Sequence, residues 1–243
     1  MDLTDHVAFV TGASRGIGRA CAIAFARQGT HVALAARSPG DLEQTADLCR
    51  EHDVEALTVE TDVSDPEDVQ AAINYAVEEF DQLNFLVNNA GRDTRQPIDR
   101  ADVDEWKQIV DVNLMGTIYA TRYASPHLKL AASDEEQAAV VNIASIAGQM
   151  SFPEGGAYCS SKHGVVGLGG SAFEDLREYG IKVSTLSPGY VNTGMVSKDQ
   201  LDADKMIQPE DIAQTVLFVA RYPDTGCPTD ITIRPQRTPY LDG

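Results

Sequence analysis

Cysteine is scarce in this chain of 243 residues, and its thiols are scattered. The chain has four cysteines, Cys21, Cys49, Cys159 and Cys227, and no two of them form a C-x-x-C pair. This spacing argues against a disulfide framework and against a zinc site, because both need cysteines in close groups. We therefore expect no bound metal and a reducing, cytoplasmic location.

Basic residues are scarce as well. The chain has 19 Lys and Arg against 37 Asp and Glu, which gives a formal net charge of −18. A surface of this sign repels nucleic acid and anionic membranes, so we expect neither as a partner. Solubility alone explains such a charge, and adaptation to a salty cytoplasm is an alternative that composition leaves open.

Long apolar runs are missing too. No stretch approaches the ~20 apolar residues that are needed to cross a bilayer. The polar and acidic start, Met1 to His6, does not resemble a signal peptide. The sequence therefore predicts a globular protein without a membrane-spanning segment.

Short apolar runs alternate with longer stretches of helical spacing along the whole chain. This alternation is typical of βαβ crossovers, which build a parallel sheet with helices on both faces. Proline at positions 66 and 209 indicates two of the helix starts, whereas residues 129–137 are predicted to be a polar loop. We expect a single α/β domain over residues 1–243, with a short tail at 234–243 and seven strands near residues 6–11, 30–35, 54–60, 83–87, 138–145, 181–187 and 229–233.

A glycine-rich segment, Thr11 to Gly18, follows the first predicted strand and leads into a predicted helix. Glycine tolerates positive φ and lets backbone N–H groups approach a pyrophosphate at the positive end of a helix. The spacing here is G-x-x-x-G-x-G instead of the common G-x-G-x-x-G. Such a turn can also be purely structural, so a dinucleotide site needs support from other residues.

The end of the second predicted strand bears on the choice of dinucleotide. An acidic residue there usually accepts the ribose hydroxyls of NAD, whereas an arginine accommodates the 2′-phosphate of NADP. This chain has Ala36-Arg37-Ser38, with no carboxylate, and Arg15 in the glycine turn is placed to reach the same phosphate. We predict NADP(H); the alternative is that both arginines are solvated surface residues.

Tyr158 and Lys162 lie four residues apart in a stretch, Ala157 to Tyr179, that is predicted to be helical, so they share one helix face. A free phenol has a pKa near ~10, and a nearby ammonium is expected to lower it. Ser145 is predicted to end a strand at the carboxyl edge of the sheet, where its hydroxyl would hold a substrate oxygen. Together they indicate hydride-transfer chemistry.

With the glycine turn, Ser145, Tyr158 and Lys162 make the chain resemble the short-chain dehydrogenase/reductase family. The resemblance runs from about Asp5 to Arg234. The resemblance implies a doubly wound Rossmann fold, and within the family it is to NADP(H)-preferring carbonyl reductases and 3-oxoacyl-acyl-carrier-protein reductases. The motifs that carry it, in order, are Thr11-Gly12-x-x-x-Gly16-x-Gly18, Asp62-Val63, Asn88-Asn89-Ala90-Gly91, Asn113, Ser145, Tyr158-x-x-x-Lys162, and Ser187-Pro188-Gly189 followed by Thr193.

The resemblance also implies roles. Tyr158 would be the general acid or base, Ser145 would position the carbonyl or alcohol, Lys162 would tune Tyr158, and Asn113 would hold a water in a proton relay through Lys162. A homotetramer packed through the helices before the fifth and sixth strands is expected, or else a homodimer. The expected cofactor contacts are Gly12, Ser14, Arg15, Gly16, Ile17, Gly18, Arg37, Asp62, Val63, Asn89, Ala90, Gly91, Tyr158, Lys162, Pro188, Gly189, Val191 and Thr193.

The substrate pocket is expected between Ser145, the loop 146–156 and the segment after Gly189. A predicted lining without Arg or Lys favours a neutral, moderately hydrophobic ketone, aldehyde or secondary alcohol. The short, charged segment 196–208 would leave this pocket open. The lining residues that we expect are Gln149, Met150, Phe152, Tyr190 and Met195.

Three functions stay open. The first is NADPH-dependent reduction of a small carbonyl compound, or the reverse oxidation. The second is a fixed metabolic substrate such as a 3-oxoacyl thioester, although docking an acidic carrier protein calls for a basic patch that this acidic chain does not offer. The third is a redox sensor that binds a dinucleotide without catalysis, which would have no need for an acidified phenol.

Overall fold

A single parallel sheet organises the computed structural model, which describes residues 1–134, 136–195 and 201–241. Within these residues its strand order is β3-β2-β1-β4-β5-β6-β7, so the chain direction across the sheet reverses between β1 and β4. The strands are β1 (Val7–Thr11), β2 (His31–Ala36), β3 (Ala56–Glu60), β4 (Phe85–Asn88), β5 (Ala139–Ile143), β6 (Lys182–Pro188) and β7 (Asp230–Ile233).

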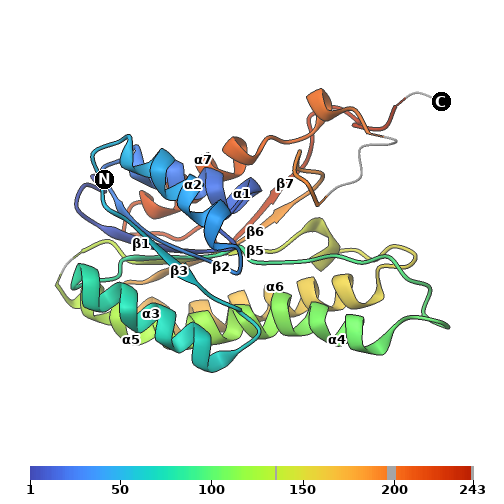
Figure 1. Cartoon of the computed structure of the whole chain (residues 1–243), viewed down its shortest axis with the longest axis horizontal. Coiled ribbons are helices and arrows are strands. Elements are labelled where there is room, and N and C mark those ends of the chain that lie inside the picture. The colour runs from blue at the N-terminus through green and yellow to red at the C-terminus, as the bar shows by residue number, and fades with distance from the viewer. Residues whose placement is uncertain (135, 196–200, 242–243) are drawn as a thin grey trace.

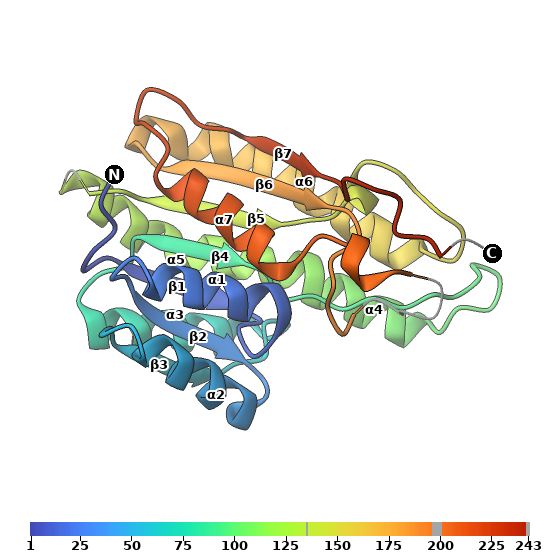
Figure 2. The same ribbon diagram turned by 90° about the horizontal axis from the view of Figure 1, so that it is seen from above.

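Helices cover both faces of the sheet, as Figure 1 shows and as Figure 2 shows from above. One face carries α1 (Gly16–Ala26), α2 (Pro39–Arg50) and α7 (Pro209–Ala220). The other carries α3 (Pro66–Phe80), α4 (Val103–Val110), α5 (Gly116–Ser133) and α6 (Gly156–Leu176). The predicted doubly wound, seven-stranded Rossmann fold is confirmed.

Two apolar cores form because successive residues of a strand point to opposite faces. In β1, Ala8 and Val10 pack with α1, α2 and α7, whereas Val7 and Phe9 pack with α3, α5 and α6. All four side chains are fully buried. Since both cores share the one sheet, the inner strands β1, β4 and β5 are buried along their whole length, which is why they appear in the sequence as largely apolar runs.

Proline sets the start of α3 and α7, as predicted. At α3 the side chain of Asp65 accepts hydrogen bonds from the backbone N–H groups of Glu67 and Asp68, so this helix has a complete cap. At α7 the carboxylate of Asp211 accepts from the backbone N–H of Gln208 at 2.8 Å.

Two predicted boundaries are wrong. The loop expected at 129–137 is shorter, because α5 continues to Ser133 while its inner face stays buried at Leu128 and Ala131. The strand expected over 138–145 ends at Ile143, so Ser145 lies two residues beyond it, at the start of a single 3₁₀ turn, Ile146–Gly148. Ser145 thereby stands in a turn at the sheet edge and not in the ladder.

No helix in the described part of the chain is both long enough and apolar enough to span a membrane. The C-terminal tail folds back on its own chain: Tyr240 forms an isolated antiparallel bridge with Leu201, and the backbone N–H of Asp202 donates to the carbonyl of Pro239 at 2.7 Å. Figures 1 and 2 both show the tail beyond the carboxyl ends of the strands, beside the segment that precedes α7.

Candidate active site

A cavity of about 370 Å³ opens at the carboxyl ends of the strands, where the sheet order reverses between β1 and β4. Ligands of open α/β sheets bind at this kind of reversal. Most of the predicted site residues line the cavity: Gly12, Ser14, Arg15, Gly16, Ile17, Arg37, Asp62, Val63, Asn89, Ala90, Gly91, Ser145, Tyr158, Lys162, Pro188, Gly189, Val191 and Thr193. Gly18 and Asn113 do not line it.

The glycine turn depends on its glycines for two different reasons. Gly12 and Gly16 have φ of +64° and +58°, in the left-handed region that side chains rarely adopt. Gly18 is required by packing, because a Cβ there would lie 2.3 Å from the carbonyl oxygen of Gly12. Gly18 therefore shapes the turn from behind without touching the cavity.

The first turn of α1 is suited to an anion. Its N-cap residue, Arg15, gives the helix no side-chain cap, and the first turn holds no acidic residue. By contrast, α3 and α4 each begin with a capping aspartate and two further acids. The first N–H groups of a helix need partners, and a pyrophosphate would supply them at the positive end of the dipole. The residues present thus fit a dinucleotide.

Thr11 and Asn89 tie the glycine turn to the end of β4. The hydroxyl of Thr11 accepts hydrogen bonds from the backbone N–H groups of Asn89 and Ala90, at 2.9 and 3.0 Å. The side-chain amide of Asn89 donates to the carbonyls of Thr11 and Gly12, at 3.0 and 3.1 Å. These four bonds fix the two turns that form the floor of the cavity.

Arg19 is a positioning residue that sequence reasoning missed. Its guanidinium donates to the carbonyl of Ser14 in the glycine turn and, at 2.9 Å, to the hydroxyl of Thr45 on α2. Thr45 is buried and itself donates to the carbonyl of Ala13 at 3.1 Å. The only hint in the sequence is an arginine one turn into a helix that follows the glycine turn.

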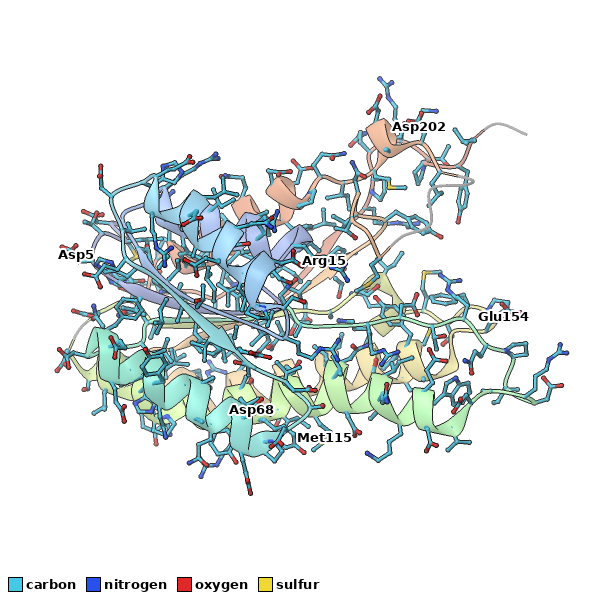
Figure 3. All side chains as sticks on the ribbon, in the orientation of Figure 1. Asp5, Arg15, Asp68, Met115, Glu154 and Asp202 are labelled. Carbon is cyan, nitrogen blue, oxygen red and sulfur yellow. The ribbon has the colours of Figure 1, made fainter. Side chains whose placement is uncertain are left out.

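The end of the cavity at β2 is mixed in charge. Arg37 is exposed directly after β2, and Figure 3 shows Arg15 at the start of α1. Burial would raise the pKa of Asp62, but hydrogen bonds from Ser64 and the charge of Arg37 outweigh it, so the pKa lies below its usual value. Asp41 lines this end as well and was not predicted. Arg37 is thus close enough to Asp62 to stabilise its carboxylate.

The chemical end of the cavity gathers Ser145, Tyr158 and Lys162. The Ser145 hydroxyl accepts from the backbone N–H of Ala147 at 3.1 Å, which orients it at the start of its turn. Tyr158 is half-buried near the start of α6. The ammonium of Lys162 is buried and donates to the carbonyl of Ile143, the last residue of β5, at 2.9 Å.

The pKa of Tyr158 lies above its usual value, whereas the neighbouring ammonium was expected to lower it. Burial raises the pKa of Tyr158, and the hydroxyl of Ser145 only partly offsets it. Burial also lowers the pKa of Lys162 to about 8, against an attraction from Asp93 that raises it. The physical reason is geometric: the Lys162 nitrogen donates to a backbone carbonyl and lies 5.9 Å from the centroid of the phenol ring.

Asn113 lies in a short π-helical segment, Asp111–Met115, between α4 and α5. Its buried side chain accepts from the backbone N–H of Arg92 at 2.8 Å and donates to the carbonyl of the same residue at 3.0 Å. It also donates to the hydroxyl of Ser161 at 3.0 Å. In the structure, then, the Asn113 side chain holds the loop after Gly91; the predicted water relay is not tested.

The substrate side differs from the expectation. Of the predicted lining residues only Met195 lines the cavity. Gln149 donates to Thr232 at 2.9 Å, Met150 is exposed, and Tyr190 contacts Tyr240, with 3.0 Å between the hydroxyl oxygens. The segment 196–200, part of the charged stretch expected to leave the site open, falls outside the described residues.

Charged residues that the sequence analysis did not place there stand beside Phe152 and Tyr158. The guanidinium carbon of Arg95 lies 4.1 Å from the centroid of the Phe152 ring, and that ring lies 6.5 Å from the ring of Tyr158. Asp93 Oδ2 lies 3.6 Å from Arg95 Nε. No spacing in the sequence links a residue shortly after Gly91 with the loop before α6.

Comparison with known proteins agrees with this geometry. A family model described as short chain dehydrogenase matches residues 6–204. An uncharacterized oxidoreductase of Staphylococcus aureus (strain USA300) is 34% identical over 233 residues, which cover 96% of this chain and 98% of that protein.

Two solved structures are similar over nearly their whole length. Carveol dehydrogenase from Mycobacterium avium in complex with NAD has a TM-score of 0.89 at 25% identity, covering 96% of this chain and 97% of that one. A metagenomic short-chain oxidoreductase in complex with NADP has a TM-score of 0.85 at 30% identity, covering 98% and 100%. With the uncapped glycine turn and the Ser145, Tyr158 and Lys162 cluster in one cavity, the chain belongs to the short-chain dehydrogenase family and is an NAD(P)-dependent oxidoreductase acting on alcohol or carbonyl groups.

Proposed function

We propose that this protein is an NADPH-dependent carbonyl reductase, which reduces a neutral ketone or aldehyde to an alcohol and can run the reverse oxidation. The observation that carries the proposal is the meeting of Ser145, Tyr158 and Lys162 in the cavity that the uncapped start of α1 also borders. A dinucleotide at that helix end would extend along the cavity toward Tyr158.

The chemistry follows from the positions of these side chains. Bound NADPH would supply a hydride to the carbonyl carbon. The hydroxyl of Ser145 would hold the carbonyl oxygen, and the phenol of Tyr158 would donate its proton to that oxygen as negative charge develops there. The ammonium of Lys162, buried beside them, would stabilise the phenolate that results.

A phenol of raised pKa suits the first half of this reaction. Burial raises the pKa of Tyr158, which favours the protonated phenol that would donate to a substrate oxygen.

Arg37 and Arg15 support the choice of NADPH. Both line the cavity, both are exposed, and neither has an ion pair among the residues that the structure describes. A guanidinium fork matches the geometry of a phosphate. The similar structures do not distinguish the two cofactors, since one is described in complex with NAD and another in complex with NADP.

The test is to follow NADPH absorbance over a mixed panel of ketones, aldehydes and 3-oxoacyl thioesters. Turnover of plain ketones supports the proposal, whereas turnover of thioesters alone would assign the second function. Tight NADPH binding, measured by fluorescence, without turnover of any compound would favour a redox sensor.

The proposal includes a homotetramer, which light scattering after size exclusion would test. Exposed apolar side chains on α4, on α5 and in the loop before them support it, among them Ile98, Val103 and Leu130. It also includes a cytoplasmic location, for which the four free cysteines are the supporting observation.

A further inference from the structure

Asp41 is an acid of the cavity that the proposed chemistry does not use. It lies in the first turn of α2 and lines the same end of the cavity as Arg37 and Asp62. Asp41 is exposed, and its carboxylate has neither an ion pair nor a hydrogen bond among the residues that the structure describes. A carboxylate that borders a ligand cavity without a protein partner is free to act on the ligand.

Hydrogen bonds hold the start of α2 against the glycine turn. Arg19 Nη2 donates to the carbonyl of Ser14 and, at 3.4 Å, to the carbonyl of Asp41. The buried hydroxyl of Thr45 lies 3.1 Å from the carbonyl oxygen of Ala13 and 3.2 Å from that of Asp41. The two turns share these donors, so the bonds that shape the glycine turn also fix the place of Asp41 beside it.

The charges at this end of the cavity are balanced. Arg15 and Arg37 bring two cations that suit a phosphate. Asp41 and Asp62 bring two carboxylates. Of these two, Asp62 is already engaged, because its Oδ1 accepts from the backbone N–H and the hydroxyl of Ser64, at 3.0 and 2.6 Å. Asp41 is therefore the carboxylate that is free to meet the adenosine ribose of a dinucleotide.

A free carboxylate acts in opposite ways on the two dinucleotides. It accepts hydrogen bonds from the ribose hydroxyls of NADH, which is the use that an acid at the end of the second strand has in folds of this kind. It repels the 2′-phosphate of NADPH. In this chain β2 ends at Ala36 and is followed by Arg37, with no acid. Asp41 supplies the carboxylate from the next helix instead.

We propose that Asp41 is a specificity-determining residue for the cofactor, whose carboxylate accepts a hydrogen bond from the adenosine ribose of NADH and repels the 2′-phosphate of NADPH. The inference rests on the proposed carbonyl reductase function and deepens it. Arg37 selects NADPH and Asp41 opposes that selection, so the enzyme works with both cofactors and prefers NADPH only modestly.

Binding of each cofactor to the whole protein is the direct test. NADPH and NADH would be titrated into the wild type, Asp41→Asn and Asp41→Ala, following cofactor fluorescence. Loss of the charge in either variant should tighten NADPH binding about two- to fivefold, as expected for exposed charges. Asp41→Ala should weaken NADH binding about two- to tenfold, because a hydrogen bond is lost. Asp41→Asn should weaken it less, because its amide oxygen still accepts.

The opposite signs separate this role from a structural one. Asp41 also stands in the positive first turn of α2, where a carboxylate favours the helix dipole. If that were its whole role, both variants would weaken both cofactors alike, and the inference would fall. The control is Asp47→Asn, the same change of charge at an exposed acid of α2 outside the cavity. It should leave both dissociation constants unchanged.

Nucleotides without a nicotinamide locate the effect. Adenosine 2′,5′-bisphosphate and 5′-AMP match the adenosine ends of NADPH and NADH, and calorimetry measures their binding without any turnover. Asp41→Ala should shift their affinities in the same opposite directions as those of the whole cofactors. If the two nucleotides bind equally to the wild type and to this variant, the carboxylate does not act on the ribose and the inference is overturned.

The two proposals fail in different ways. If carbonyl compounds are reduced with NADPH and the Asp41 variants bind both cofactors as the wild type does, the carbonyl reductase stands and the role of Asp41 falls. If no carbonyl compound is reduced with either cofactor, the proposed function falls, and the titrations alone decide the inference. Tighter binding of both cofactors by Asp41→Ala would mean that the carboxylate only repels their shared phosphates, which would also overturn the inference.

Discussion

The two sides of the active site are built in different ways. The cofactor side is made of backbone turns, which Thr11 and Asn89 join through partly buried hydrogen bonds. The substrate side is made of side chains from loops far apart in the sequence, such as Arg95 on Phe152. Figure 3 shows Glu154 and Asp202 standing well out beyond the strands, where these loops lie, with Asp5 at the opposite end. A backbone site needs a few residue types at fixed spacing, whereas a side-chain site needs contacts that no spacing specifies.

Tyr158→Phe removes the proposed proton donor, which lies between the cofactor side and the substrate side. We expect the largest effect from this substitution. Losing a general acid typically costs about 10²- to 10⁴-fold in rate, so kcat should fall by that factor while KM changes little. The dissociation constant for NADPH should stay within about threefold of the wild type, because the glycine turn is untouched.

The matched control is Tyr179→Phe, which removes the same hydroxyl from an exposed ring that lies under the Lys129 ammonium, just past the end of α6 that is opposite to Tyr158. It should keep full activity. Wild-type turnover in a folded Tyr158→Phe protein would contradict both the mechanism and the division between the two sides.

Arg37→Asp changes the cofactor side alone. The variant places a carboxylate where a 2′-phosphate would lie and removes the charge that helps to keep Asp62 ionised. The ratio of kcat/KM for NADPH to that for NADH should fall by roughly ten- to hundredfold, because a charged hydrogen bond is lost and repulsion is gained.

Initial rates with each cofactor measure this ratio. Arg27→Asp, an identical change of charge at the end of α1 and away from the cavity, serves as the control. An unchanged ratio in Arg37→Asp would rule out NADPH preference through this residue and leave NAD as the better assignment.

Much of the cofactor side was predictable from the sequence, and the reasons are local. Glycine at positive φ, proline at a first helical position and an arginine after a strand each have one dominant physical use. Even there the sequence did not predict the role of Arg19. That role depends on a hydrogen bond from Arg19 on α1 to Thr45 on α2.

The substrate side stays a prediction, because its contacts depend on side chains that the fold brings together. Phe152 was placed in the pocket, but its partner Arg95 comes from a different loop, and the fold alone brings the two together. The environment of Lys162 was also misjudged, because the sequence shows four-residue spacing but cannot show that the ammonium points to the carbonyl of Ile143. Side-chain direction is decided by packing, which one sequence does not display.

Two buried lysines sharpen the comparison between the active site and the rest of the fold. Lys182, in β6, is paired with Asp224 at 3.0 Å, whereas Lys162 donates only to a carbonyl and its pKa is lowered by burial from 10.5 to about 8. Below pH ~8 both the folded and the unfolded chain hold the Lys162 proton, and the fold bears the full cost of the buried charge. Between pH ~8 and ~10.5 the unfolded chain binds more protons, so this cost falls and stability rises with pH.

Lys162→Met removes that dependence. Relative to the variant, the wild type should gain up to about 3 kcal/mol in free energy of unfolding as pH rises from 7 to above 10, as measured by urea denaturation at a series of pH values. Lys182→Met, which removes the ion pair with Asp224, should instead be destabilised at pH 7. A pH-independent difference between wild type and Lys162→Met would mean that the buried ammonium is not under strain.

Tyr240→Phe tests the outer edge of the substrate side and should have the smallest effect. The tail residue's hydroxyl lies 3.0 Å from that of Tyr190, and the two rings meet edge to face at 5.8 Å. Replacing the hydroxyl removes one hydrogen bond between partly exposed groups but keeps the ring contact, for a cost of about 0.5–1.5 kcal/mol. We expect KM for a ketone to rise about two- to tenfold while kcat and the KM for NADPH stay the same, since the tail contacts the substrate loop and not the glycine turn. The control is Tyr222→Phe, which removes a hydroxyl from a ring that packs edge to face on Phe218. If Tyr240→Phe weakened NADPH binding as much as it raised KM for the ketone, the two sides would not be independent.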